Sequence, residues 1–116
     1  MLPSNARLRH RDDFTAVLRH GRRTTSPPLV IHVLPPNSPT DRSVGTRVGF
    51  VISAKVAGAA QRNRLRRRLR HICVDLLGEL PPGTRLVVRA LPGAAELGFA
   101  ELAGIVRRCS RRVATG

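Results

Sequence analysis

The segment from residue 62 to residue 76 combines a dense run of arginines with regularly spaced apolar side chains. A helix turns by about 100° per residue, so apolar residues three and four apart share one face. The members of this predicted face are Leu65, Leu69, Ile72, Cys73 and Leu76. The arginines that point away from it are Arg64, Arg66, Arg67, Arg68 and Arg70. The segment is therefore predicted to be a helix that packs on a core and presents a cationic surface to a polyanion.

The length and composition of the chain fit one folded domain. Its 116 residues can form a modest core, and a hydrophobic content of 41% excludes a disordered basic tail. We expect a single domain over residues 1–116, with flexible ends at 1–6 and 112–116. No apolar run approaches the ~20 residues of a membrane span, and the charged N-terminus does not resemble a secretory signal.

The charge of the chain favours nucleic acid as its partner. The formal net charge is +14, and all but one of the 21 cationic residues are arginines, the exception being Lys55. Guanidinium groups bind phosphate through two hydrogen bonds at once. A GC-rich genome would favour arginine codons over lysine codons, but it would not produce the excess of positive charge. A membrane-surface protein is the other electrostatic option, and it is disfavoured because the basic helix lacks exposed aromatic residues.

Sequence patterns predict helices and strands in alternation around the basic helix. A short helix begins at Asp12–Asp13, has Phe14, Val17 and Leu18 on its inner face, and ends at Gly21. Strands are predicted at 29–34, at 44–53 with a bend at the glycines, and at 86–88. Residues 22–28 and 35–42 are predicted to be connections, the basic helix to end near residue 78, and a last helix to follow from residue 99. Helices packed on a small sheet, an α+β architecture, are expected.

The residues offer little catalytic chemistry. None of the four histidines, His10, His20, His32 and His71, has a cysteine or a second histidine at metal-ligand spacing. There is no glycine-rich phosphate loop and no nucleophile elbow. Cys73 and Cys109 fit buried free thiols. With an aromatic content of 3%, a stacking platform for several bases is not expected, and Phe50 and Phe99 are assigned to the core.

An ordered set of motifs resembles one protein family. Lys55 followed by Arg-Asn-Arg-Leu-Arg-Arg-Arg-Leu-Arg at 62–70 resembles the signature of the bacterial ribonuclease P protein subunit. The strand-like lead-in at 47–55, Arg7-Leu8 with Asp13-Phe14 and Gly21, the run at 86–89, and Phe99 are similar to the family pattern in the same order. The resemblance extends over roughly residues 7–110.

The resemblance implies a fold and a role. The fold is a compact single-domain α/β sandwich with the order α-β-β-β-α-β-α, a small mixed sheet and a left-handed β-α-β crossover. The role is that of an RNA-binding subunit of an endoribonuclease whose large RNA, with Mg²⁺ bound chiefly by the RNA subunit and substrate, cleaves precursor tRNA at the mature 5′ end. The protein supplies no catalytic residue. It is expected to be a cytoplasmic monomer in a complex of one RNA and one protein, away from membranes.

The resemblance also assigns two groups of site residues. The residues expected to bind the RNA subunit are Arg62, Asn63, Arg64, Arg66, Arg67 and Arg70. The residues expected to form a cleft for the 5′ leader are Phe14, Leu18, His32, Ser53, Lys55 and Arg89. Leu18 and His32 stand where relatives often have aromatic residues, and Ala54 replaces a common lysine. Leader binding is therefore expected to depend more on charge and less on stacking.

Two other classes of function fit the basic helix. One is a non-enzymatic structural RNA-binding protein, ribosomal or chaperone-like. The other is a DNA-binding module with residues 62–76 as a recognition helix in the major groove. The strand-rich surroundings and the scarcity of base-reading side chains disfavour the DNA-binding module.

Overall fold

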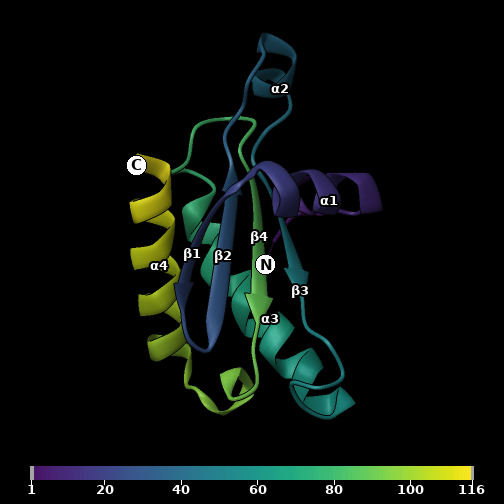
Figure 1. Ribbon diagram of the computed structural model, residues 1–116, viewed down its shortest axis with the longest axis vertical. Helices are drawn as coiled ribbons and strands as arrows, with labels where there is room; N and C mark the ends of the chain where they lie inside the picture. Colours follow the sequence, from purple (N-terminus) through teal and green to yellow (C-terminus); the bar gives the residue numbers. More distant parts are fainter. Residues whose placement is uncertain (1, 116) are drawn as a thin grey trace.

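A four-stranded mixed sheet forms the centre of the protein (Figure 1). The computed structural model of the chain describes the backbone of residues 2–115 and their side chains except those of 4, 41, 42 and 113–115. The strands are β1 (Arg22–Ser26), β2 (Leu29–Leu34), β3 (Arg47–Val51) and β4 (Arg85–Ala90), in the spatial order β1-β2-β4-β3. β2 is antiparallel to both of its neighbours, whereas β3 and β4 are parallel.

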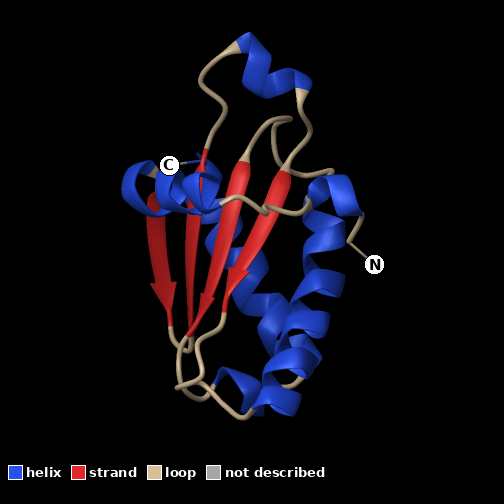
Figure 2. Ribbon diagram, turned by 90° about the vertical axis from the view of Figure 1, so that its right-hand side faces the viewer, coloured by secondary structure: helices blue, strands red, loops and turns tan. Residues whose placement is uncertain are grey.

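Helices cover both faces of this sheet. Helix α1 (Arg11–His20) lies on one face, and helices α3 (Ala59–Leu76) and α4 (Phe99–Thr115) lie on the other (Figure 2). Three short helical segments complete the chain, η1 (Ser4–Ala6), α2 (Pro39–Ser43) and η2 (Ala94–Glu96). Because both faces are covered, β2 is an almost continuous apolar run rather than an alternating one. The expected α/β sandwich and its order α-β-β-β-α-β-α are confirmed, with the short α2 as an addition.

The connection from β3 through α3 to β4 is a left-handed crossover. In Figure 1, β3 and β4 both point downward, β4 lies to the left of β3, and α3 lies behind the sheet. Parallel strands joined through a helix are right-handed in about 98% of known cases, so this connection is an exception. It places α3 beneath the β3 edge of the sheet, where its outer face is accessible.

The apolar residues form two clusters, one on each side of the sheet. The larger cluster fills the space between the sheet and helices α3 and α4, and it includes all five residues of the predicted apolar face of α3, each 0–1% exposed. The smaller cluster lies beneath α1. It consists of Leu8, Val17 and Val87, with Phe14, Leu34 and Val51 packed around them. The sequence prediction for the arginine helix is therefore confirmed in both its position and its buried face.

Three segment predictions were wrong. Residues 22–26, predicted to be a connection, form strand β1, which lies at the edge of the sheet and exposes many of its polar side chains. Such a strand carries no hydrophobic pattern that a sequence could reveal. Strand β3 is shorter than the predicted 44–53. Before the strand begins, Val44 is exposed, and Thr46 Oγ1 donates a hydrogen bond to the carbonyl oxygen of Pro81. Part of the predicted loop at 35–42 belongs to α2.

The N-terminal segment is packed rather than loose. We expected residues 1–6 to be flexible, but Leu2 and Ala6 are buried in the larger cluster. Leu2 and Ala6 are separated by proline and polar residues, so they form no periodic apolar pattern in the sequence. At the other end, α4 continues to Thr115, so most of the predicted flexible tail at 112–116 is helical. Met1 and Gly116 lie outside the described residues.

Two apolar side chains assigned to the interior are exposed. Phe99 is 48% exposed at the start of α4, and Leu18 is 38% exposed on α1. Phe50 is half-buried and lines a surface groove as well as touching the core. Cys73 and Cys109 are buried free thiols, as predicted.

Candidate nucleic-acid interface

The outer face of α3 carries all six residues predicted to bind an RNA subunit. Asn63, Arg64 and Arg67 are exposed, and Arg62, Arg66 and Arg70 are half-buried. None of them belongs to the buried face of the helix. The structure therefore brings these residues together on one accessible surface, which we call the arginine face.

Hydrogen bonds orient several side chains of the arginine face. Arg66 Nη1 donates to Asn63 Oδ1 at 3.2 Å, so the single asparagine in the arginine run holds a neighbouring guanidinium in place. Arg62 Nη1 donates to the carbonyl oxygen of Ala57 at 3.0 Å, beside the start of the helix. A guanidinium fixed in this way loses less side-chain entropy when it binds a phosphate.

Arg68 has a different function from its neighbours. Its Nη1 donates to the carbonyl oxygen of Leu97 at 3.1 Å, which ties α3 to the segment before α4. The two residues are 29 positions apart, so the contact has no local sequence signal. Arg68 is thus a structural residue inside a run that otherwise faces outward.

The sheet face beneath α1 holds the aromatic part of the predicted leader cleft. The ring of Phe14 lies over Gly49 of β3, so closely that a Cβ atom at position 49 would overlap the ring. Phe14 also packs with the smaller apolar cluster, which fixes its position on α1. Glycine at position 49 is therefore required for this placement of Phe14.

His32 lies on the same face and is 3% exposed. Neither ring nitrogen has a hydrogen-bond partner among the described residues. Burial lowers the pKa of His32, and the positive charges of Arg89 and Arg23 lower it further. The imidazole is therefore neutral at pH 7, with one donor and one acceptor nitrogen.

The other predicted cleft residues are spread along this face and its border. Arg89 pairs in register with Val30 and Val51, so it projects on the same side of the sheet as His32. Leu18 is exposed on α1, one helical turn after Phe14. Ser53 and Lys55 are exposed beyond the end of β3. Phe14, His32 and Arg89 thus form the centre of the predicted cleft, and Ser53 and Lys55 lie at its border.

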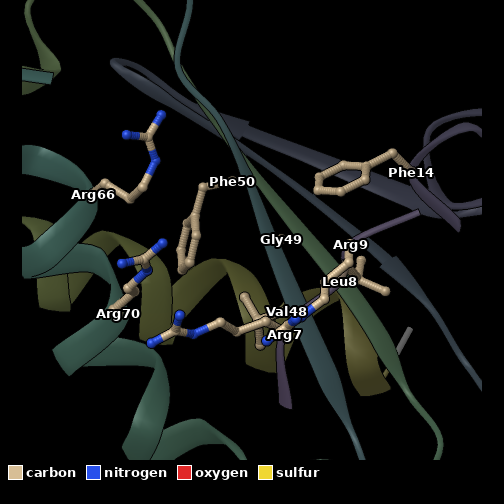
Figure 3. A pocket seen from close by; sticks show the side chains of 9 residues that line it. All are labelled: Arg7, Leu8, Arg9, Phe14, Val48, Gly49, Phe50, Arg66 and Arg70. Atoms are coloured by element: carbon tan, nitrogen blue, oxygen red, sulfur yellow. The ribbon is translucent and has the colours of Figure 1, made fainter. Parts of the chain in front are cut away.

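A groove of about 470 Å³ runs along the free edge of β3 (Figure 3). Arg66 and Arg70 of α3 stand beside Phe50 on one side of the strand, and Phe14 stands on the other. Arg7 and Arg9 of the N-terminal segment line its floor. The sequence showed Arg7 only as part of the family pattern and assigned neither arginine to a site, because only the path of the chain brings them to α3.

A carboxylate fixes α1 to the sheet. Asp13 Oδ1 lies 3.1 Å from Arg85 Nη1, and Asp13 Oδ2 lies 3.3 Å from Arg47 Nη1. The three side chains are 18–26% exposed, so solvent screens these pairs only in part. Asp13 was interpreted only as a helix start, and its two partners lie 34 and 72 residues away.

The thiols and carboxylates of the described residues do not form a reactive site. Burial raises the pKa of Cys73 to about 12 and also raises that of Cys109, so both remain protonated at neutral pH. Between residues 2 and 115, no three His, Cys, Asp or Glu side chains are grouped so that they could hold a metal ion. Over the same range, no helix is both long and apolar enough to cross a membrane.

The fold and the site define a class of protein. An arginine-covered helix and an adjoining basic groove lined by Phe14 and Phe50 lie on one α/β sandwich, so this is a nucleic-acid-binding protein. A sequence model of the family described as Ribonuclease P matches residues 2–114. The chain belongs to the ribonuclease P protein family.

Relatives and solved structures agree with this assignment. The chain is 45% identical over 116 residues to the ribonuclease P protein component of Mycolicibacterium paratuberculosis, a match that covers 100% of this chain and 98% of the relative. It is 49% identical over 107 residues to that of Streptomyces bikiniensis, covering 89% of this chain and 87% of the relative. The Staphylococcus aureus RNase P protein has the same fold, with a TM-score of 0.78 at 16% identity over 94% of this chain and 97% of that one.

Family membership settles the class of function. The chain acts in tRNA 5′ processing as the protein subunit of the endoribonuclease ribonuclease P. The alternatives of a ribosomal or chaperone-like RNA-binding protein and of a DNA-binding module are not favoured.

Proposed function

We propose that the arginine face of α3 binds the catalytic RNA of ribonuclease P. The observation that carries this proposal is the division of α3 into two sides, one fully buried and one carrying Arg62, Asn63, Arg64, Arg66, Arg67 and Arg70. So many like charges on one helix repel one another, and RNA phosphates relieve that repulsion. The bond from Arg66 to Asn63 supports the proposal, because it orients a guanidinium before RNA binds.

We further propose that the face beneath α1 binds the single-stranded 5′ leader of precursor tRNA. Phe14 offers an aromatic ring and Arg89 a positive charge, whereas His32 is 3% exposed and supports this face from beneath as a neutral imidazole. Leu18, Ser53 and Lys55 extend this surface at its border. Binding of the leader favours precursor over mature tRNA, because only the precursor carries it.

This second proposal has a direct test at Phe14. In Phe14→Ala, the affinity of the reconstituted complex for precursor tRNA should fall, while its affinity for mature tRNA stays constant. Base stacking on an aromatic ring contributes about 1–3 kcal/mol, so a loss of roughly fivefold to 150-fold is expected. An unchanged precursor affinity would remove Phe14 from the leader site.

Catalysis is assigned to the RNA subunit. Mg²⁺ prefers several oxygen ligands, and Asp13, one of the few carboxylates, is already bound by two arginines. We therefore propose that Mg²⁺ is held chiefly by the RNA subunit and the substrate. The protein offsets repulsion between RNA phosphates near the cleavage site, so fewer Mg²⁺ ions are needed to hold the catalytic fold of the RNA. The proposed complex contains one RNA and one protein monomer, in the cytoplasm and without membrane attachment.

Cleavage at low Mg²⁺ tests the proposed function as a whole. The RNA subunit and precursor tRNA are combined at a Mg²⁺ concentration at which the RNA alone is nearly inactive. Adding the protein should restore cleavage at the mature 5′ end. An Arg64→Ala/Arg67→Ala variant should restore much less, whereas Arg108→Ala/Arg112→Ala, which removes two exposed charges from helix α4, serves as a charge-matched control. Equal activity with all three proteins would contradict the assignment of α3.

A further inference from the structure

The N-terminal segment is held against the free edge of β3 by several contacts. The backbone N–H of Leu8 donates to the carbonyl oxygen of Val48 at 2.9 Å, and Arg7 forms a parallel β-bridge with Val48. Leu2 and Leu8 are buried, and Arg7 Nη2 donates to the carbonyl oxygen of Leu2 at 3.1 Å. The guanidinium group of Arg7 therefore occupies a defined position beside the sheet.

These contacts place four arginines around one groove. Arg7 and Arg9 come from the N-terminal segment, and Arg66 and Arg70 come from α3 (Figure 3). The other lining residues are Leu8, Phe14, Val48, Gly49 and Phe50, none of which is a carboxylate. Its volume of about 470 Å³ lies within the ~300–1,000 Å³ of typical ligand sites.

The positive charge in the groove is incompletely compensated by the protein. Arg7 Nε and Arg70 Nε are buried and have no hydrogen-bond partner among the described residues. Burial lowers the pKa of Arg70, and the charges of Arg7 and Arg66 lower it further. Unpartnered buried donors and crowded like charges both cost free energy, and a bound anion removes both costs.

The walls of the groove favour a single strand of nucleic acid as the anion. Phe14 and Phe50 flank β3 on opposite sides, and aromatic rings beside a cationic track are typical of single-strand binding sites. Phe14 also belongs to the proposed leader surface beneath α1, so the two surfaces are continuous.

We propose that Arg7 and Arg9 bind phosphates of the precursor-tRNA 5′ leader, in a groove that continues the leader path past Phe14, around the edge of β3, to Arg66 and Arg70. This inference rests on the proposed function. It adds Arg7 and Arg9 to the leader-binding residues and states in which direction the leader runs along the protein. The leader then meets the RNA-binding face of α3, which brings the substrate strand next to the catalytic RNA.

Arg9 provides the clearest test, because its side chain is exposed and its replacement leaves the buried contacts of Arg7 intact. In Arg9→Gln, the affinity of the reconstituted complex for precursor tRNA should fall roughly threefold to tenfold, and the slope of log affinity against log salt should become less negative by about 0.7. Affinities for mature tRNA and for the RNA subunit should not change. Arg112→Gln, on α4, is the matched control, and unchanged melting temperatures would confirm that both variants fold.

Site-directed crosslinking identifies the strand directly. The native thiols are buried, with raised pKa values, so an Arg9→Cys variant can be labelled selectively with a photoreactive reagent. Crosslinks to the leader of bound precursor tRNA are expected, and an Arg112→Cys label should give none there. Crosslinks only to the RNA subunit, or an equal loss of affinity for precursor and mature tRNA in Arg9→Gln, would overturn the inference. Undiminished RNA-subunit binding by Arg64→Ala/Arg67→Ala would instead overturn the proposed function.

Discussion

Gly49 shows how one residue without a side chain can determine a binding surface. It lies at the edge strand β3, and its missing Cβ leaves room for the ring of Phe14 and for Leu8. The residue therefore connects the packing of α1 to the chemistry of the proposed leader site. Its role in the packing of α1 and its role in the proposed leader site cannot be recognised from a glycine in the sequence.

Replacing Gly49 by alanine should harm both stability and substrate discrimination. The new methyl group would force the Phe14 ring out of its position, and such overpacking costs about 1–3 kcal/mol of unfolding free energy. Chemical denaturation should show this loss, and the preference for precursor over mature tRNA should fall with it. Gly45→Ala is a matched control, since a Cβ there meets nothing within 4 Å. Equal stability of the two variants would contradict the close contact between Phe14 and Gly49.

His32 should make folding stability sensitive to mild acid. Its pKa is lowered from 6.5 in the folded protein, so the unfolded chain binds more protons between the two values. Stability therefore rises with pH in that interval: the contribution is complete above pH 6.5 and is lost as the pH falls through the lowered pKa. Melting temperatures measured from pH 5 to pH 8 should show this decline, and His32→Phe should reduce it. A similar reduction in His71→Gln, at an exposed histidine, would contradict the assignment to His32.

Neighbouring arginines of α3 should separate into structural and RNA-binding residues. Arg68→Ala removes a bond to the carbonyl oxygen of Leu97 and should cost about 1–2 kcal/mol of unfolding free energy, with little effect on RNA affinity. Arg67→Ala should change the free energy of unfolding by no more than ~0.5 kcal/mol, but it should weaken RNA-subunit binding by about 1–3 kcal/mol. Thermal melts and equilibrium binding distinguish the two. Indistinguishable variants would contradict the division of roles.

The elements differ in how much their sequences reveal. Helix α3 was predictable because five apolar residues at helical spacing meet a core that buries all of them. Strand β1 was not, since its polar residues at the sheet edge carry no burial pattern. The resemblance of the motifs to a family supplied the mixed sheet and the left-handed crossover, which no local pattern encodes, and the spatial order of the strands came only from the structure.

The candidate site was predictable where its residues are adjacent in sequence. The six residues of the arginine face lie within one helix and needed no tertiary information. The groove at β3 combines residue 7 with residue 70, and the Asp13 pairs extend over 34 and 72 positions. Such contacts follow from the path of the chain, and only the three-dimensional structure reveals them.

The whole protein combines a net charge of +14 with a core of moderate size. Part of that charge is paired within the fold: Asp13 binds Arg47 and Arg85, and Asp75 binds Arg107. The arginine face of α3 and the groove at β3 lie side by side, and Arg66 and Arg70 belong to both. The two proposed binding surfaces therefore meet along one edge of the sheet.

Equilibrium binding of the protein to the catalytic RNA, measured over a range of salt concentrations, tests this electrostatic design most directly. If each of the five arginines of the arginine face neutralises one phosphate, the slope of log affinity against log salt should be about −3.5 to −4.5. Arg64→Ala/Arg67→Ala should make it less negative by about 1.5 to 2, and Arg112→Ala should leave it unchanged. A slope near zero for the unaltered protein, or equal slopes for all three, would show that α3 does not bind the RNA through its arginines.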